Sequence, residues 1–502
     1  MRIHWHRRDL RVADNLGLVG SGTEGTGADE HGPGSEGGET GTAGTTGTGT
    51  LPVFVFDDSV LAHAGPPRVR FLLDAVGDLR EAYRDRGGDL LVTSGDPSAV
   101  LPDLVAEYGA DRVTWSRDYS GLARERDEAV RAALEDLGVA VDSVHDAVLH
   151  PPGSITTNEG DPYAVFTYFG RKWHDREADE PVAAPDGGDF ERPASTEPVP
   201  DLEDLGVESP AAEVPAGTRA AGLDRLARFC EGPIYRYGER RDFPAAEDTS
   251  RLSPHLKFGT LGIREVYAAT RQAMDQASER LPDVDDPAPA TVEAARESVE
   301  EYQSQLAWRE FYTQVLWANP ETVSEDYREY PEPIEWADDP EGLDAWRAGE
   351  TGFPIVDAGM RQLRAEAWMH NRVRMIVASF LTKDLRIDWR AGYDWFRRRL
   401  VDHDTANDVG GWQWAASTGT DAQPYFRIFN PTTQGERYDP EGTYVQRYVS
   451  ELEGVPADAI HGWTELAEAE REAHAPDYPA PIVDHAERRE AALEMFERAR
   501  GE

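Results

Sequence analysis

The sequence predicts an α/β domain built on a parallel sheet, followed by an all-helical domain. Within the first 150 residues, short apolar runs alternate with amphipathic stretches, a pattern typical of parallel strands separated by helices. From about residue 220 onward, the apolar residues recur with the period of a helix. The length of 502 residues also suggests two or three domains, each large enough to bury a core.

The N-terminal unit is expected to be Rossmann-like. No G-x-G-x-x-G motif follows the first strand, so the sequence does not support a dinucleotide-binding fingerprint there. The expected strands are Arg2–His6, Pro52–Asp57, Asp89–Thr93, Arg112–Trp115 and Ala140–Val144, and helices are expected near residues 68–87, 97–109 and 121–137.

Two segments break this pattern and set the domain limits. Residues 20–50 contain 12 glycines and eight threonines, a composition typical of a flexible insertion. Residues 178–218 are rich in Pro, Asp, Glu and Ala without periodicity, which indicates a connection between domains. We therefore expect an α/β domain over 1–150, a linker over 151–219 and a helical domain over 220–502.

The helical half is justified by a series of stretches with helical periodicity. No strand-like alternation separates them, so we expect helices packed on helices. The expected helices are Leu223–Tyr235, Ile263–Gln276, Val292–Ala318, Gly342–Ala348, Pro354–Glu366, Asn371–Thr382, Trp389–Leu400 and a last one near 484–500.

The chain is strongly acidic. Its 51 Lys and Arg against 95 Asp and Glu give −44 at pH 7, which excludes a generally basic surface that coats nucleic acid. Only three basic residues are lysine, and this acidic, Lys-poor composition is typical of adaptation to high salt. The single cysteine, Cys230, excludes an intramolecular disulfide and a Cys-rich zinc site. Without a signal region or a long apolar run, the protein is expected to be soluble and cytoplasmic.

One segment departs from the acidic average. Nine of the 13 tryptophans lie between Trp308 and Trp414. Residues 361–399 hold ten basic and four acidic residues, a net charge of 10 − 4 = +6. Tryptophans usually fill cores and charge runs usually face solvent. Together, however, cations and flat rings are what binding of single-stranded or flipped bases requires.

Two short stretches place ligand-binding groups on one helix face. Asn371, Arg374 and Met375 follow the spacing i, i+3, i+4, and Gln305 stands in a similar stretch with Trp308. Asp402 and Asp404 stand in a later segment, but no further acid or histidine completes a coordination shell, so no metal site is expected. The sequence contains none of the common hydrolase or P-loop motifs.

Five motifs in order carry a resemblance to a known family. They are Trp5–Arg11 (WHRRDLR), Thr249–Ser253 (TSRLS), Trp308–Tyr312 (WREFY), Trp368–Arg372 (WMHNR) and Gly410–Asp421 (GGWQWAASTGTD). Together they closely resemble class I cyclobutane pyrimidine dimer DNA photolyases of the photolyase/cryptochrome family. The composition suggests a haloarchaeal member. The resemblance covers nearly the whole chain except the 20–50 insertion and the linker.

The resemblance implies a lyase that repairs UV-damaged DNA with light. Its α/β domain holds an antenna chromophore, and its helical domain holds FAD. Excited reduced FAD passes an electron to a flipped-out pyrimidine dimer, the cyclobutane ring opens, and the electron returns. Hydroxyls and backbone N–H groups near Ser253 would suit a pyrophosphate. The implied FAD contacts are Tyr237, Thr249, Ser250, Arg251, Leu252, Ser253, Arg309, Asn371, Arg374, Asp402, Asp404 and Asp408.

The same resemblance assigns the remaining site residues. The antenna residues are Arg68, Asp118 and Lys257, and they favour an 8-hydroxy-5-deazaflavin over a folate. Trp336, Trp389 and Trp412 match the family's electron-transfer chain. Gln305, Asn371 and Met375 would contact the dimer bases, between Trp308 and Trp414. The residues that hold the DNA strand would be Arg241, Arg372, Arg427 and Gln434, and the protein is expected to act as a monomer.

Two departures from the family pattern leave other activities open. Gln305 stands where many dimer photolyases have Glu, and Gln there also occurs in cryptochromes and (6-4) photolyases. Asp408 stands where dimer photolyases usually have Asn opposite flavin N5, and plant-type cryptochromes have Asp there. The alternatives are therefore a cryptochrome-type blue-light receptor and a (6-4) photolyase.

Overall fold

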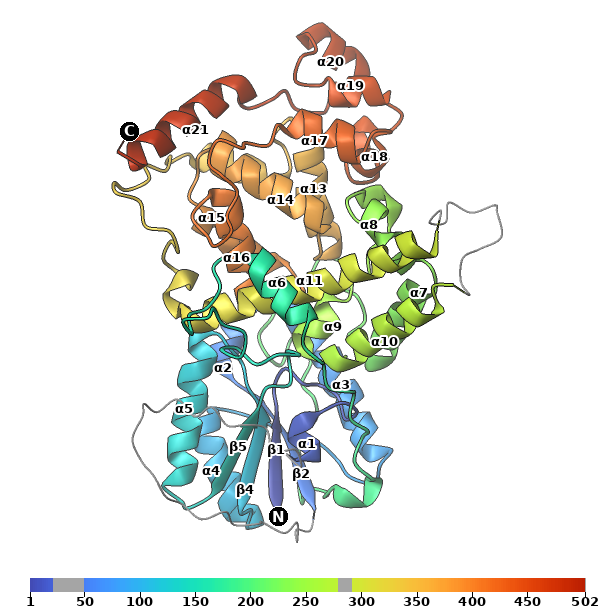
Figure 1. The fold of residues 1–502 in the computed structure, drawn as a ribbon, viewed down its shortest axis with the longest axis vertical. Coiled ribbons are helices and arrows are strands. Elements are labelled where there is room, and N and C mark those ends of the chain that lie inside the picture. Colours follow the sequence, from blue (N-terminus) through green and yellow to red (C-terminus); the bar gives the residue numbers. More distant parts are fainter. Residues whose placement is uncertain (21–48, 279–290, 502) are drawn as a thin grey trace.

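A computed structural model describes residues 1–20, 49–278 and 291–501. The α/β domain lies at one end of the molecule and the helices of the second half form the other end (Figure 1). Nearly all of the insertion expected over 20–50 lies outside the described residues. No described helix is both long and apolar enough to cross a membrane.

The sheet has five parallel strands in the order β3-β2-β1-β4-β5. Its first strand is central, and Trp5 is in register with Val53 of β2 and with Trp115 of β4. This order and the crossover helices confirm the predicted Rossmann-like sheet. The strands are β1 Arg2–His6, β2 Thr50–Phe56, β3 Leu91–Ser94, β4 Arg112–Ser116 and β5 Ala140–Val144.

Helices cover both faces of the sheet because both faces are apolar. Phe54 and Phe56 of β2 pack with Phe71 in one core cluster. Val53, which points to the opposite face of the sheet, packs with Leu101 in another cluster. A buried parallel strand is apolar on both sides for this reason. The helices of this domain are α1 Leu16–Val19, α2 Asp58–Leu61, α3 Pro66–Arg84, α4 Pro97–Tyr108 and α5 Gly121–Glu135.

The segment expected as a linker contains the helix α6, Phe166–His174. Phe169 and Trp173 are buried and share a core cluster with Phe311 of the helical domain. In Figure 1, α6 lies across the long helix α11. The helix has nine residues and lies between irregular segments, so its periodic signal is too short to stand out in the sequence.

The second half is helical, as predicted, but with more elements than the periodicity indicated. The helices are α7 Arg219–Glu231, α8 Tyr237–Arg240, α9 Ser253–Phe258, α10 Ile263–Gln276, α11 Val292–Ala318, α12 Pro340–Ala348, α13 Pro354–Glu366, α14 Asn371–Ser379, α15 Trp389–Arg399, α16 Thr405–Ala416, α17 Pro431–Tyr438, α18 Thr443–Tyr448, α19 Ala457–His461, α20 Glu468–His474 and α21 His485–Ala499.

Helix α16 is the main element that periodicity missed. Gly410 and Gly411 disfavour a helix on propensity alone. In the structure, a Cβ at Gly410 would lie only 2.1 Å from Cδ1 of Tyr312, so the glycine lets α16 approach α11 closely. Tertiary packing therefore decides this helix.

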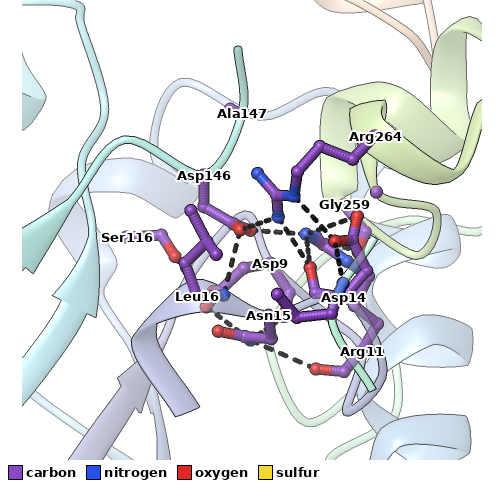
Figure 2. A network of polar contacts seen from close by, with 12 residues as sticks. Asp9, Arg11, Asp14, Asn15, Leu16, Ser116, Asp146, Ala147, Gly259 and Arg264 are labelled. Carbon is purple, nitrogen blue, oxygen red and sulfur yellow. Dashed lines mark hydrogen bonds and ion pairs between the residues drawn. The ribbon is translucent and has the colours of Figure 1, made fainter. Parts of the chain in front are cut away.

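Four buried charges, which we call the closed network, join the two domains (Figure 2). Arg264 of α10 contacts Asp14 at 2.7 Å and Asp146 at 2.5 Å, and Arg11 contacts the other oxygen of Asp146 at 2.5 Å. All four side chains are at most 3% exposed. Two cations and two carboxylates thereby hold the helical domain on the α/β domain.

Candidate functional site

The Arg374 guanidinium marks the centre of the candidate site. Its Nε donates to the carbonyl of Met369 at 2.8 Å, and its Nη2 lies 2.7 and 3.0 Å from the oxygens of Asp402. Its Nη1 lies 3.9 Å from Asp408 of α16. Helix α14 thus places the Arg374 cation beside two carboxylates. Asp402 comes from the loop before α16, and Asp408 comes from the first turn of α16.

Asp408 has a second partner that the sequence reading missed. Its Oδ2 lies 2.5 Å from Nδ1 of His403, and both side chains are less than 10% exposed. Burial lowers the pKa of His403, against the opposing effect of the Asp408 charge. The only signal in the sequence was the short distance along the chain, in Asp-His-Asp-Thr-Ala-Asn-Asp.

A second group of charges, which we call the open cluster, lies where the domains meet. Arg8 contacts Asp118 at 2.7 Å and Asp404 at 3.4 Å, and Lys257 lies 3.9 Å from Asp404. We count the largely buried Arg309 as the fifth member, because the charges of Arg8 and Asp404 both act on its pKa. The structure therefore brings two predicted antenna residues and two predicted FAD residues together through Arg8.

The electrostatics of the open cluster follow from this geometry. The neighbouring cations hold the pKa values of Asp118 and Asp404 below their usual range despite burial. Burial lowers the pKa of Lys257 and of Arg309. Arg309 also donates to the carbonyl of Ala147 at 2.7 Å. Three cations thus lie beside Asp118 and Asp404, and the further carboxyl group near Arg309, that of Glu310, has a pKa that burial raises to about 7. The excess of positive charge suits an anionic ligand.

The WHRRDLR motif is held in place by a buried polar core. His4 contacts Asp9 at 3.1 Å and Thr114 at 2.9 Å, and His6 contacts the Tyr83 hydroxyl at 2.6 Å. Ligand atoms of His4, His6 and Asp9 lie within 4.8 Å of one another, but these hydrogen bonds already occupy them. Burial lowers the pKa of His4 to about 4. The core fixes the loop from which Arg8 projects.

Among the described residues, Arg68 forms no hydrogen bond or ion pair with the other two predicted antenna residues, although its charge acts on Lys257. From α3 it donates to the backbone carbonyl of His63, and its Nη1 is buried with no partner among the described residues. Burial lowers its pKa to about 10, and Asp408 is the carboxylate that opposes this most strongly. The structure therefore relates Arg68 to the Arg374 centre as much as to Lys257.

The TSRLS motif offers one free polar group. Thr249 Oγ1 is buried and has no partner among the described residues, which fits a ligand oxygen at this position. Ser250 accepts from the Tyr302 hydroxyl at 3.1 Å, and Tyr237 packs edge-on against the same ring at 5.2 Å. Arg251 instead pairs with Glu366 at 3.0 Å.

The last two residues of this motif serve packing. Leu252 is buried in the helical core, and the Ser253 hydroxyl accepts from Trp368 Nε1 at 3.3 Å. Of the predicted FAD contacts here, Thr249 has the freest side chain, whereas the Leu252 N–H donates to Ser250 Oγ at 3.4 Å.

The residues predicted to contact the dimer lie on α11 and α14. Gln305 donates to Glu301 at 2.9 Å, and Glu301 pairs with Arg241 at 2.5 Å. Asn371 Nδ2 lies 3.9 Å from the Met375 sulfur, which confirms that these two share a helix face. Glu301 is a further polar group that the sequence reading missed.

The two tryptophans predicted to flank the dimer have aromatic neighbours of their own. Phe166 of α6 stacks on Trp308 at a centroid distance of 3.8 Å and an angle of 10°. Trp414 lies 6.3 Å from Phe429. One face of Trp308 is therefore covered, so a base can stack on its other face only. No pattern in the sequence indicated that α6 reaches this ring.

Some of the side chains predicted to hold the DNA strand already have partners within the protein. Arg372 pairs with Asp242 at 2.9 Å and stacks over Tyr438 at 4.4 Å. Arg427 is exposed, and Gln434 Oε1 is buried without a partner among the described residues. An arginine that is paired in this way neutralises an acidic group of its own protein, so less of its positive charge is available to a DNA phosphate.

The three tryptophans of the predicted electron-transfer chain lie in one hydrophobic core. Trp389 and Trp412 are fully buried there, and Trp336 packs against it from a half-buried position. Trp389 donates from Nε1 to Asp326 at 2.8 Å. Trp412 also contacts Trp346 at a ring distance of 6.1 Å, a neighbour that the sequence reading did not single out.

Comparison with known proteins identifies the family. Residues 302–498 match the model of the FAD binding domain of DNA photolyase, and residues 2–186 match that of DNA photolyase. The chain is 58% identical to the deoxyribodipyrimidine photo-lyase of Halobacterium salinarum over 509 aligned residues, covering 100% of both chains. This chain therefore belongs to the DNA photolyase family.

Solved structures agree in fold. A bacterial class III photolyase from Agrobacterium tumefaciens matches with a TM-score of 0.85 at 34% identity, covering 100% of this chain and 98% of that one. An archaeal photolyase from Sulfolobus tokodaii with two FAD molecules matches with a TM-score of 0.79 at 30% identity, covering 99% of both. The parallel sheet followed by the helical domain is thus the architecture of photolyases.

Proposed function

We propose that this protein is a deoxyribodipyrimidine photo-lyase, an enzyme that uses light to split cyclobutane pyrimidine dimers in DNA. The observation that carries the proposal is the full-length, 58% identical relative of that name. The buried Arg374–Asp402 pair at the centre of the matched FAD-binding domain supports it.

In this proposal the Arg374 centre and Thr249 hold FAD. Bound, reduced FAD supplies one electron from its excited state and recovers it after the ring of the dimer has opened. Arg374, fixed by Asp402 and by the Met369 carbonyl, contributes a positive charge that stabilises an anionic reduced flavin. The open cluster adds positive charge through Arg309.

The dimer would enter between Trp308 and Trp414. Photolyases are among the enzymes that take their target out of the base stack, which costs less for damaged bases because they pair poorly. Phe166 holds the Trp308 ring in a fixed plane for stacking. Gln305 and Asn371 would hydrogen-bond the dimer bases as neutral amides.

Trp336, Trp389 and Trp412 are proposed to carry electrons from the surface to the flavin. Their common location in one core supports this assignment, because electron transfer requires short distances between rings. The half-buried Trp336 would exchange electrons with a reductant in solution, and the fully buried Trp412 would stand nearest the flavin.

An antenna chromophore is proposed at Asp118 and Lys257. The Sulfolobus tokodaii relative contains two FAD molecules, with the implication of a novel light-harvesting cofactor. For this chain we propose 8-hydroxy-5-deazaflavin rather than a folate, because Arg68, Asp118 and Lys257 match the positions of family members that bind a deazaflavin. Chromatography of the pigments released from the purified protein separates a deazaflavin from a folate or a second FAD.

Within the family we propose class I, a haloarchaeal source and a monomeric state. The five ordered motifs support class I, and the acidic, Lys-poor composition with the Halobacterium salinarum relative supports a salt-adapted protein. Sedimentation in concentrated salt tests the monomer.

One experiment tests the repair activity. The reduced, FAD-loaded protein is incubated in high salt with DNA carrying cyclobutane dimers, with blue light or in the dark. We expect loss of dimers only in the light, with the same DNA kept dark as the matched control. If light leaves the dimers intact, Gln305 and Asp408 make a cryptochrome-type receptor the better assignment. Loss of (6-4) products instead would indicate a (6-4) photolyase.

A further inference from the structure

Glu310 of α11 is a buried carboxyl group that the proposed repair steps do not use. It is 2% exposed and stands two residues after Trp308 in the WREFY motif. Its Oε1 accepts from the backbone N–H of Leu149 at 2.5 Å, and its Oε2 accepts from that of His150 at 3.2 Å. The indole Nε1 of Trp173 also donates to Oε2, at 2.8 Å. One side chain of α11 thereby holds both the segment that leaves the α/β domain after β5 and the helix α6.

Helix α6 has little stability of its own. It has only nine residues, and its N-cap residue Val165 makes no side-chain hydrogen bond. Short helices are marginal in water without tertiary contacts. The buried face of α6 consists of Phe169, Gly170 and Trp173. The bond from Trp173 to Glu310 therefore fixes the C-terminal turn of α6 in position on α11.

The first residue of α6 reaches the ring proposed to stack on the dimer. Phe166 lies over Trp308 at a centroid distance of 3.8 Å and an angle of 10°. A Cβ at Gly170 would lie 3.1 Å from Cζ of Phe166, so the glycine lets the phenyl ring lie close against its own helix. Phe311 and Tyr312 lie 5.5 and 5.6 Å from the Trp308 ring, but neither is parallel to it. The position of α6 therefore sets the plane of the Trp308 ring.

We propose that Glu310 is a positioning residue for recognition of the dimer. Through Trp173 it holds α6 on α11, and α6 in turn keeps Phe166 against the Trp308 ring. The inference rests on the proposed function, because it takes Trp308 as a stacking partner of the dimer.

The expected effect follows from the cost of ordering a side chain. A ring that is already oriented loses less conformational freedom on binding than one that rotates, so the bound state is more favourable. Undamaged bases stay in the duplex stack and gain little from this orientation. Loss of the Glu310 contacts should therefore weaken binding of dimer-containing DNA more than binding of undamaged DNA.

The test compares Glu310→Gln with a matched variant, Asp357→Asn on α13. Asp357 is also fully buried, and it also accepts from a backbone N–H, that of Thr351, and from an aromatic side chain, that of Tyr478. Tyr478 lies in a different hydrophobic cluster from Trp173. Both changes replace a buried carboxyl group by an amide of the same shape, so both should lower the free energy of unfolding.

The measurement is the dark affinity of the FAD-loaded protein, in concentrated salt, for two duplexes that differ only in one cyclobutane dimer. Burial raises the pKa of Glu310 to about 7, so the assay is run above neutrality, where both of its oxygens only accept. For Glu310→Gln we expect the ratio of the two affinities to fall about tenfold, as for loss of one buried charged hydrogen bond. Asp357→Asn should leave this ratio unchanged.

Two further variants test the route through α6. Trp173→Phe removes the indole donor and leaves both backbone bonds to Glu310. Phe166→Leu removes the ring that covers Trp308. Each should lower the same affinity ratio. If Glu310 acts through Phe166, adding Glu310→Gln to Phe166→Leu should lower the ratio little further.

Three outcomes overturn the inference: an unchanged ratio in Glu310→Gln, an equal fall in Asp357→Asn, or additive losses in the double variant. If Glu310→Gln does not fold, Trp173→Phe carries the test, and an unchanged ratio there contradicts the route through α6. Light-dependent dimer loss is measured on the same wild-type preparation. A wild-type protein that repairs dimers, with unchanged ratios in the variants, contradicts only the role of Glu310. A wild-type protein that repairs no dimers contradicts the proposed function.

Discussion

The closed network and the open cluster both lie at the boundary of the two domains, yet they differ in charge balance. In the closed network, Arg11 and Arg264 face Asp14 and Asp146, two charges against two. In the open cluster, three cations face two carboxylates. A balanced buried set needs no ligand, whereas an unbalanced one is more stable with an anion. The difference separates a structural joint from a proposed binding site.

The largest effect is expected from Arg264→Met, which opens the closed network. Two buried carboxylates then share one cation, and breaking a buried pair in this way costs about 3–5 kcal/mol. Chemical unfolding in concentrated salt measures the loss.

The same helix supplies the control for this change. Arg271→Met removes an arginine from an exposed pair with Glu180, which should cost about 0–1 kcal/mol. Similar losses for the two variants would mean that the closed network is not a joint.

Arg309→Met tests whether the open cluster serves ligand binding more than stability. Two cations would then face two carboxylates, but the Ala147 carbonyl would lose its donor, so we expect the free energy of unfolding of the FAD-free protein to fall by about 1–3 kcal/mol, less than for Arg264→Met. Affinity for FAD should fall about tenfold, which corresponds to about 1.4 kcal/mol. Titration of FAD-free protein with FAD measures it. A strongly destabilised protein with unchanged FAD affinity would reverse the roles assigned to the two charge groups.

Lys257→Met separates the two ligands proposed for the open cluster. Lys257 contacts Asp404 only at 3.9 Å, so its removal should leave FAD binding close to normal. The antenna pigment should be lost or sharply reduced in the purified protein. Light-dependent repair should persist when the flavin is excited directly. Retention of the full antenna content would exclude Lys257 as an antenna contact.

The smallest effect is expected in the salt dependence of DNA binding. Arg241 and Arg372 are already paired with Glu301 and Asp242, so DNA binding should release few counterions. The logarithm of DNA affinity should therefore fall less steeply with the logarithm of salt than it does for a basic photolyase, with stacking at Trp308 and Trp414 supplying the rest. Dark binding of dimer-containing DNA at several salt concentrations measures the slope. A slope equal to that of the basic enzyme would show that the paired arginines still act on phosphate.

Much of the fold could be read from periodicity. All five strands were predicted to within two residues at each end, because buried parallel strands are short, apolar and bounded by turns. Helix α7 is displaced from its predicted position, since Thr218 caps its start and Gly232 follows its end. Helices α6 and α16 were missed because their stability comes from Phe311 and Tyr312 of α11, which lie far away in the sequence.

The candidate site likewise contains residues that the sequence could indicate and contacts that it could not. Motif resemblance singled out Arg374, Asp402 and Asp408, and the structure brings these three together. It could not indicate that Phe166 covers Trp308, or that Arg8 joins the residues expected to serve two different cofactors. These contacts connect segments separated by more than 100 residues, and local spacing carries no information about them.

The sequence by itself determined the order of the two domains, the acidic surface and the family motifs, because all three are properties of local pattern and composition. The tertiary structure decided which charges are balanced. Arg8, Arg11, Arg264 and Arg309 are all largely buried arginines, and only the positions of the nearest carboxylates make two of them part of a joint and two part of the proposed binding site.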